Sequence, residues 1–297
     1  MARIHQLTIR QFEKMFPNED ACAAYLVAHR WPDGVHCPRC GSVRIYALTT
    51  MAFKWECPDC RHGGAYRFSV LAGTIFENTN KPLREWFRVI HMMLTSKKGV
   101  SALQIQRVMG FGSYRTAWHM CHRVRAGLAD EKFQQLMGIV EADETFVGGK
   151  SHNRRKDKRG GPGTSGKTAV AGTVQRKGNV VARVISNTDT ATIEAFLGHA
   201  LSTGVNLIAT DEHSAYRNLD KSADWQHGVV RHSAEDYVVG VIHTNTIEGF
   251  WSILKRGIMG TFHKVSAKYL RLYVAEFEFR YNNRMDADIF GAAISAC

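Results

Sequence analysis

Three acidic residues and one lysine are spaced along the second half of the chain in a way that suits phosphoryl transfer. They are Asp143, Asp211, Glu248 and Lys255, with 67, 36 and six residues between them. Carboxylates are the hard oxygen ligands that Mg²⁺ (or Mn²⁺) prefers. Two such ions can hold the attacking and leaving oxygens of an in-line displacement. The spacing therefore predicts a catalytic metal site at the three carboxylates, with the lysine placed to contact a phosphate.

The residues around Glu248 have the periodicity of a helix over 246–256. Asn245, Glu248 and Lys255 fall on one face of it, and apolar residues such as Trp251 fall on the other face. The helix would therefore pack its apolar face on a sheet and present the glutamate and the lysine together.

The elements that position the acids follow the order of a ribonuclease-H-like domain. Asp143 lies within the first predicted strand, and Asp211 follows the buried strand 206–210 directly. Because strand side chains alternate, Glu144 should point to the face opposite Asp143, which favours Asp143 as the ligand. Strands are predicted at 138–149, 168–176, 179–186, 206–210 and 229–232, and helices at 190–201, 246–256 and 266–283.

Four of the seven cysteines form two CxxC pairs, with 16 residues between the pairs. This spacing is typical of a four-cysteine structural zinc site, and the intervening segment reads as a hairpin. Two disulfides are the alternative, which a reducing compartment disfavours. The predicted Zn²⁺ ligands are Cys37, Cys40, Cys57 and Cys60.

A basic helical segment follows the cysteines. Helices are predicted at 83–94, 102–109 and 114–128, with a glycine turn at 110–112. This order fits a helix-turn-helix whose last helix reads DNA, although a plain helical bundle has the same spacing. The residues expected to contact DNA from the last helix are Arg115, His119, Arg123 and Arg125.

The charge balance favours a polyanionic partner. The net charge is +12 and the pI is about 9.5. Residues 82–128 hold eight Lys and Arg against one acid, and residues 150–167 hold seven against one. Such patches bind nucleic acid through counterion release. No apolar run is long enough for a membrane span, and no signal peptide is evident, so we expect a cytoplasmic protein.

The segment 148–168 is basic and rich in glycine. Residues 161–168 fit the phosphate-loop pattern GxxxxGKT, which leaves an ATPase open as an alternative. No strand leads directly into the pattern and a strand-like run follows it, so a DNA-contacting loop is favoured. Its predicted contacts are Arg154, Arg155 and Lys156.

These motifs together resemble those of bacterial insertion-sequence transposases of the insertion-sequence-1595 family. The resemblance spans about residues 15–285 and is carried by the cysteine pairs, KKGVSALQIQRVMGFGSYRTAWHMCHRVR, ADETFVGG, TDEHSAY and HTNTIEGFWSILKRG. It implies an integrase-type DDE domain, with Asp143, Asp211 and Glu248 as metal carboxylates and Lys255 as a DNA contact. Because family members vary at the third position, Asn245 stays an alternative to Glu248.

The resulting expectation is a multidomain α+β DNA transposase that acts at the nucleoid as a homo-oligomer on DNA. It would bind the terminal inverted repeats of its element, cut the ends and join them to target DNA. Two alternatives are a silent DNA-binding regulator derived from such an enzyme and a structure-specific nuclease of the same fold. The expected domains are an N-terminal helical segment (1–34), a zinc ribbon (35–78), a helix-turn-helix segment (80–130) and the DDE domain (136–290).

Overall fold

The chain forms two compact units in the computed structural model. The structure describes residues 7–60, 65–129, 133–149, 164, 166–221, 225–230 and 242–297. One unit comprises Met1–Ser96, Val100–Leu128 and Asn283–Cys297, and the other comprises Lys97–Gly99 and Ala129–Asn282. The last fifteen residues therefore belong with the N-terminal part of the chain, whereas the sequence placed the end of the catalytic domain at 290.

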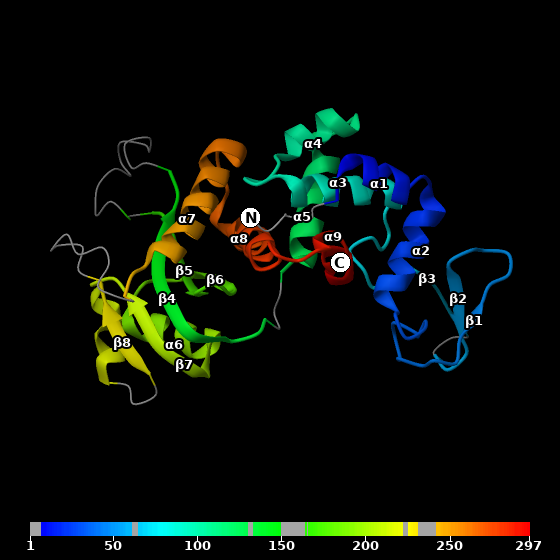
Figure 1. The fold of residues 1–297 in the computed structure, drawn as a ribbon. Coiled ribbons are helices and arrows are strands. Elements are labelled where there is room, and N and C mark those ends of the chain that lie inside the picture. Colours follow the sequence, from blue (N-terminus) through cyan, green and yellow to red (C-terminus); the bar gives the residue numbers. More distant parts are fainter. Residues whose placement is uncertain are drawn as a thin grey trace. The chain divides into compact units, whose positions relative to one another are not determined.

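The second unit is built on a mixed five-stranded sheet in the order β6-β5-β4-β7-β8 (Figure 1). Strands β4, β5 and β6 pair antiparallel, whereas β7 runs parallel to β4 and β8 runs parallel to β7. This arrangement confirms the predicted ribonuclease-H-like order. The strands are β4 (Leu136–Val147), β5 (Thr168–Gln175), β6 (Val180–Ile185), β7 (Leu201–Thr210) and β8 (Gln226–Val229). The last strand starts three residues earlier than predicted.

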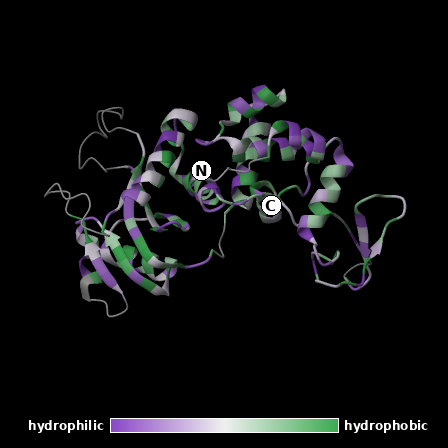
Figure 2. Cartoon of the chain, viewed as in Figure 1, coloured by the Kyte–Doolittle hydropathy of each residue, from purple (hydrophilic) through white to green (hydrophobic). Residues whose placement is uncertain are grey.

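Helices cover both faces of this sheet. Helix α6 (Thr190–Ala200) and the 3₁₀ segment η3 (Ser214–Lys221) pack on one face. Helices α7 (Asn245–Gly257) and α8 (Ala267–Asn282) pack on the other. A π-helical turn, Ile258–Phe262, extends α7 directly. Figure 2 shows hydrophobic stretches along the central strands, which agrees with cores on both faces.

Strand β4 separates its side chains between these two cores. Val140 and Ala142 belong to the core under α6, and Val147 belongs to the core under α7. Since side chains alternate along a strand, Glu141 and Asp143 face α7. The fold thus directs the first predicted catalytic acid toward the helix that carries the third.

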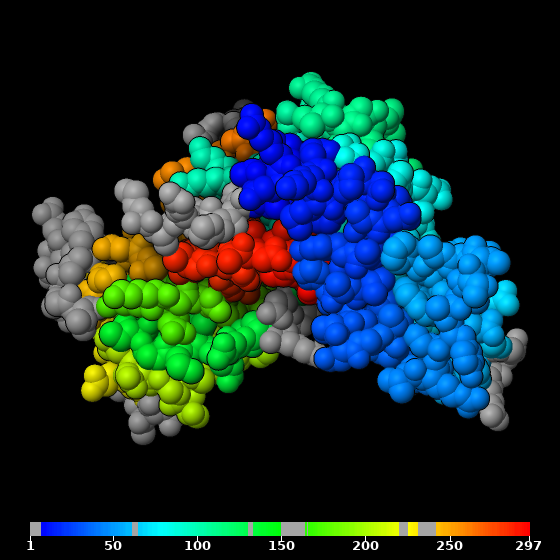
Figure 3. Space-filling view, turned by 45° about the vertical axis from the view of Figure 1, so that its right-hand side comes forward, coloured from blue at the N-terminus to red at the C-terminus, as the bar shows by residue number. Residues whose placement is uncertain are grey.

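The first unit is helical and holds both ends of its sequence together. Figure 3 shows the C-terminal segment beside the N-terminal helices, and the ring of Phe290 packs 5.5 Å from the rings of Phe16 and Phe87. Asn18 caps the second helix by accepting from the Ala21 N–H at 2.9 Å. The helices are α1 (Ile9–Met15), α2 (Glu19–Arg30), α3 (Leu83–Thr95), α4 (Ala102–Met109), α5 (Tyr114–Gly127) and α9 (Ile289–Ala296).

The cysteine pairs lie on a small antiparallel sheet in the same unit. Its strands are β1 (Tyr46–Ala47), β2 (Lys54–Cys57) and β3 (Tyr66–Ser69), in that order. The ring of Trp31, which follows α2, lies 5.4 Å from that of Trp55 and 6.2 Å from that of Phe68. This aromatic contact joins the ribbon to the helices.

Helices α4 and α5 are joined by a sharp turn. Ser101 caps α4 through the Gln104 N–H at 3.1 Å, and Ser113 caps α5. Between them Gly110 takes a left-handed conformation with φ of 68°, which glycine adopts without a steric cost. The helix, glycine turn and helix expected from the sequence are therefore present. No helix among the described residues is long and apolar enough to cross a membrane.

Candidate active site and metal centre

Asp143 and Asp211 come together at neighbouring strands of the central sheet. The parallel register of β4 and β7 pairs Glu141 with Ala209. Asp211 lies two residues beyond Ala209, as Asp143 does beyond Glu141, so the two aspartates reach the same level. Asp211 then turns the chain, because its Oδ1 accepts from the His213 N–H at 3.0 Å.

The three predicted carboxylates interact electrostatically. Burial and, after it, the charges of Asp211 and Glu248 raise the pKa of Asp143, which comes to about 6 overall. The Glu144 N–H, which donates to Asp143 Oδ1 at 2.8 Å, and the indole of Trp251 act oppositely. Mutually repelling carboxylates with hard oxygen donors fit a divalent cation. The oxygens of these carboxylates are spaced more widely than the sulfurs of the four cysteines. Among the described residues, the cysteines are the one group of potential metal ligands whose donor atoms all lie within 4.8 Å of one another.

Glu144 points to the other face of the sheet, as predicted. The pKa of Glu144 is raised to about 7 overall, because burial and the charges of Asp143 and Asp211 outweigh the lowering by a hydrogen bond with Tyr216. Tyr216 is buried in the core under α6. Glu144 therefore lies behind the acidic cluster, while Asp143 lies in it.

The α7 residues of the predicted site lie on its exposed side. Glu248 is exposed, and its Oε1 accepts from the Thr244 hydroxyl at 3.1 Å. Lys255 is exposed two turns later, and Asn245 is the exposed first residue of the helix. The charge of Glu248 acts on Asp143, as the last of the effects that raise its pKa after burial and the charge of Asp211.

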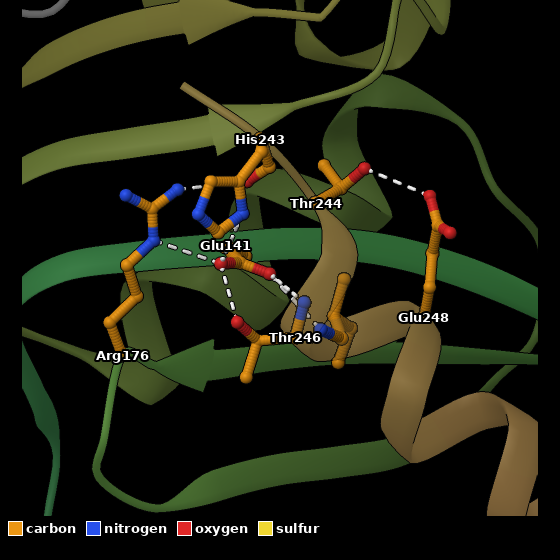
Figure 4. Close-up of polar contacts among 7 residues, drawn as sticks. Glu141, Arg176, His243, Thr244, Thr246 and Glu248 are labelled. Atoms are coloured by element: carbon orange, nitrogen blue, oxygen red, sulfur yellow. Dashed lines mark hydrogen bonds and ion pairs between the residues drawn. The ribbon is translucent and has the colours of Figure 1, made fainter. Parts of the chain in front are cut away.

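Two further residues of this site were not found from the sequence. Gly172 pairs with Asp143 across β4 and β5, and Trp251 packs directly over it. Glu141 is fully buried and contacts Arg176, His243 and the first turn of α7 (Figure 4). Strand alternation puts Glu141 on the same face as Asp143, and this was the signal in the sequence that could have identified Glu141 as a buried acid.

The four cysteines form a compact cluster. Their Sγ atoms lie within 4.8 Å of one another, with Cys37 3.7 Å from Cys60 and Cys40 3.6 Å from Cys57. Thiolates at ~2.3 Å from one tetrahedral Zn²⁺ are about 3.8 Å apart, whereas a disulfide needs ~2.05 Å. All four are free cysteines. The geometry favours one metal over the alternative of two disulfides.

The thiol environment suits a bound cation. Burial raises the pKa of Cys37, but hydrogen bonds with the backbone of Cys40 and Arg39 lower it to about 7 overall. Burial and the neighbouring thiols raise the pKa of Cys60 to about 12. A dication would offset this mutual repulsion and hold all four sulfurs as thiolates.

The residues predicted to contact DNA from α5 differ in exposure. Arg115 and His119 are exposed, one turn apart, with Arg115 Nε 3.4 Å from His119 Nε2. Arg123 is half-buried and donates to the Glu77 carbonyl at 2.9 Å. Arg125 is 1% exposed, so the expectation that it contacts DNA is corrected: its side chain fills the interior of the first unit.

The glycine-rich segment lacks the surroundings of a phosphate loop. Residues 161–168 run into strand β5 at Thr168, whereas a phosphate loop opens a helix. This finding removes support from the ATPase alternative. The predicted contacts Arg154, Arg155 and Lys156 lie outside the described residues.

Two family models match this chain. Residues 135–282 match the ISXO2-like transposase domain, and residues 17–63 match the transposase zinc-ribbon domain. An uncharacterized protein in transposable element ISH50 of Halobacterium salinarum is 28% identical over 280 residues, which cover 90% of this chain and 92% of that protein.

A solved structure is also similar in part. It is the simian T-cell lymphotropic virus intasome in complex with PP2A regulatory subunit B56 gamma, with 16% identity and a TM-score of 0.31. The match covers 65% of this chain and 65% of that chain, a little under two thirds of its length.

The two domain matches fall on the two parts of the chain in which the cysteine cluster and the acidic cluster were found. A zinc-ribbon domain precedes a transposase domain whose mixed sheet brings Asp143 and Asp211 together. The chain therefore belongs to the insertion-sequence-1595 family of transposases.

Proposed function

We propose that this transposase binds the terminal inverted repeats of its insertion sequence, cuts the DNA at the element ends and joins the freed 3′-hydroxyls to target DNA. The observation that carries the proposal is the convergence of Asp143 and Asp211 on neighbouring strands with Glu248 on α7, since the charges of Asp211 and Glu248, after burial, raise the pKa of Asp143. Family membership supports DNA as the substrate. The activity is that of a polynucleotidyl transferase with endonuclease capability.

In this proposal Asp143, Asp211 and Glu248 would hold two Mg²⁺ (or Mn²⁺) ions. Bound there, the ions supply a polarised attacking oxygen and stabilise the leaving oxyanion. Asp143 comes from a central strand, Asp211 from the end of its neighbour and Glu248 from a packed helix, so the protein presents oxygens from three directions. Lys255 lies two turns from Glu248 on the same helix, where it orients the DNA backbone.

The first unit is proposed to recognise DNA. Cys37, Cys40, Cys57 and Cys60 hold a structural Zn²⁺, because sulfur fills every position and leaves none for water. The α4–α5 pair acts as the helix-turn-helix, with Arg115 and His119 exposed for contact. Arg123, Asn245 and the basic loop 148–168 with Arg154, Arg155 and Lys156 would contribute further DNA contacts.

Two DNA ends must be processed for one element, so we propose a homo-oligomer assembled on DNA at the nucleoid. The predicted domains at 1–34, 35–78, 80–130 and 136–290 remain part of this proposal.

The test is incubation of the protein with DNA carrying the flanking element ends and Mg²⁺, with products resolved on a denaturing gel. We expect nicked ends and joined products, both lost in Asp143→Ala while binding of the ends persists. Nicking guided by branched DNA without joining would replace the proposal with a structure-specific nuclease. Specific binding with no cleavage in Mg²⁺ or Mn²⁺ would replace it with a silent regulator.

A further inference from the structure

Glu141 is a buried carboxylate whose oxygens are fully engaged by donors. Its side chain is 0% exposed. Its Oε1 accepts from Arg176 Nε at 2.9 Å and from the Thr246 hydroxyl at 2.8 Å. Its Oε2 accepts from the backbone N–H of Thr246 at 2.7 Å and of Ile247 at 3.0 Å. Donors on both oxygens make Glu141 a poor metal ligand, although it lies on the same strand face as Asp143.

The contacts of Glu141 replace a missing cap on helix α7. The first N–H groups of a helix have no partner within the helix, and the N-cap residue Thr244 makes no capping side-chain hydrogen bond. Glu141 satisfies two of these groups from 105 residues away in the sequence. A negative charge there is also favoured by the helix dipole. The start of α7 is thus bonded to β4 directly.

Arg176 holds the segment just ahead of α7 in the same network (Figure 4). It follows strand β5, pairs with Glu141 and donates through Nη2 to the His243 carbonyl at 3.0 Å. The ring Nδ1 of His243 lies 3.2 Å from Glu141 Oε1. Glu141 of β4 and Arg176, which follows β5, therefore hold the two sides of the point where the helix begins.

This network sets the position of the third catalytic acid. Glu141 and Asp143 are two residues apart on one strand face, and Glu248 lies one turn into the helix that Glu141 anchors. We infer that Glu141 is a positioning residue, which through Arg176 and the first turn of α7 holds Glu248 at the distance from Asp143 and Asp211 that metal binding needs. The inference rests on the proposed function of those three carboxylates.

The test variant is Glu141→Gln in the full-length protein. A glutamine side chain has one accepting oxygen, and its N–H₂ group is itself a donor. It therefore cannot accept hydrogen bonds from all the donors that surround the two oxygens of Glu141. The matched control is Glu278→Gln, because Glu278 is another buried acid of this unit, bonded to Arg183 Nη1 at 2.7 Å and to the Ala182 N–H at 3.2 Å. This variant changes an ion pair between β6 and α8.

Two measurements need no catalysis: Mn²⁺ affinity by calorimetry and hydrogen exchange of residues 246–250. For Glu141→Gln we expect Mn²⁺ binding weakened by about tenfold or more, and faster exchange of the Thr246 and Ile247 amides. Glu278→Gln should change neither. Thr246→Val, which removes only the hydroxyl, should give a smaller loss of affinity in the same direction and covers the case in which Glu141→Gln fails to fold.

A double-mutant cycle separates positioning from a general structural role. If Glu141 acts through Glu248, Glu141→Gln should add little further loss of Mn²⁺ affinity in a Glu248→Gln background, because the effects of coupled residues do not add. Independent, additive losses would overturn the inference, as would unchanged Mn²⁺ affinity and exchange in Glu141→Gln. Wild-type protein that binds Mn²⁺ but neither nicks nor joins DNA would sink the proposed function alone, since the cycle measures binding only.

Discussion

Gly172 on β5 lies directly opposite Asp143 on β4, and a Cβ on Gly172 would come within 2.5 Å of the Trp251 ring. The missing side chain thus lets α7 pack tightly over the strand pair that carries Asp143. Figure 4 shows that the N-terminal end of the same helix approaches β4 at Glu141, which accepts hydrogen bonds from it. Helix α7 is therefore held at two points, by close packing at Gly172 and by hydrogen bonds at Glu141.

Gly172→Ala should displace Trp251 and with it the helix that carries Glu248. Overpacking of this kind lowers the free energy of unfolding by about 1–3 kcal/mol, and we expect cleavage of element ends to fall as well. Urea denaturation and single-turnover cleavage measure the two effects. Gly198→Ala is the control, because an added Cβ meets nothing within 4 Å and alanine favours the α6 helix by about 0.5–1 kcal/mol. Unchanged stability in Gly172→Ala would contradict the packing argument.

The third catalytic position can be assigned by paired substitutions on α7. Glu248→Gln should abolish nicking, because it removes the charge that acts on Asp143. Asn245→Ala should leave measurable nicking, since Asn245 is an exposed first residue of the helix. Initial rates on pre-bound DNA ends provide the comparison. The reverse ranking of the two variants would transfer the role to Asn245.

Asp143 should make the stability of the metal-free protein depend on pH. Its pKa in the folded protein is raised from 3.8 to about 6, so folding favours the protonated acid. The stability that this contributes is present below about pH 4 and is lost as the pH rises through 6. Thermal unfolding of wild type and Asp143→Asn from pH 4 to 7 should show wild type losing stability relative to the variant.

Mg²⁺ should reverse that loss in wild type at pH 7 and not in Asp143→Asn, because the ion binds the ionised carboxylate. A difference between the two proteins that does not change from pH 4 to 7 would show that Asp143 ionises normally.

The cysteine cluster should hold one Zn²⁺ per chain. Cys57→Ser removes one ligand of a site in which all Sγ atoms lie within 4.8 Å, so zinc content measured by atomic absorption should fall and the ribbon should lose protection from proteolysis. Cys22→Ser serves as the control, since Cys22 is buried in α2 and lies outside the cluster. Full zinc content in Cys57→Ser would show that the cluster is not the site.

Substitutions of Arg115 and Arg125 should have different effects, the first on DNA binding and the second on stability, although both residues lie on α5. Arg115→Ala removes an exposed cation and should weaken binding of element ends, reducing the salt-dependence slope by about one. Arg125→Ala removes a side chain that is 1% exposed and should lower the free energy of unfolding by about 1–3 kcal/mol. Fluorescence anisotropy and urea denaturation distinguish the two. If Arg115→Ala and Arg125→Ala weakened DNA binding equally per folded molecule, the assignment of Arg115 as a DNA contact and Arg125 as an interior residue would be wrong.

The sequence by itself determined the elements and the ligand types. Alternation in β4 put Asp143 and Glu144 on opposite faces, helical spacing put Ile247, Trp251 and Leu254 on the buried side of α7, and the CxxC spacing predicted the four-sulfur cluster. These features are local, because they depend on periodicities of two or 3.6 residues or on ligand pairs close in the chain. They can be read without knowing how the chain folds back.

Only the tertiary structure decided which polar groups are buried and what they contact. Arg125 and Arg115 are both cations of one predicted helix, yet Arg115 is exposed and Arg125 is 1% exposed. Glu141 resembles a spare ligand beside Asp143, and its role appears only when a helix 105 residues later brings two backbone N–H groups to it. Gly172 is an ordinary strand glycine until Trp251 lies over it. Each outcome depends on contacts between distant segments, and spacing along the chain carries no information about those contacts.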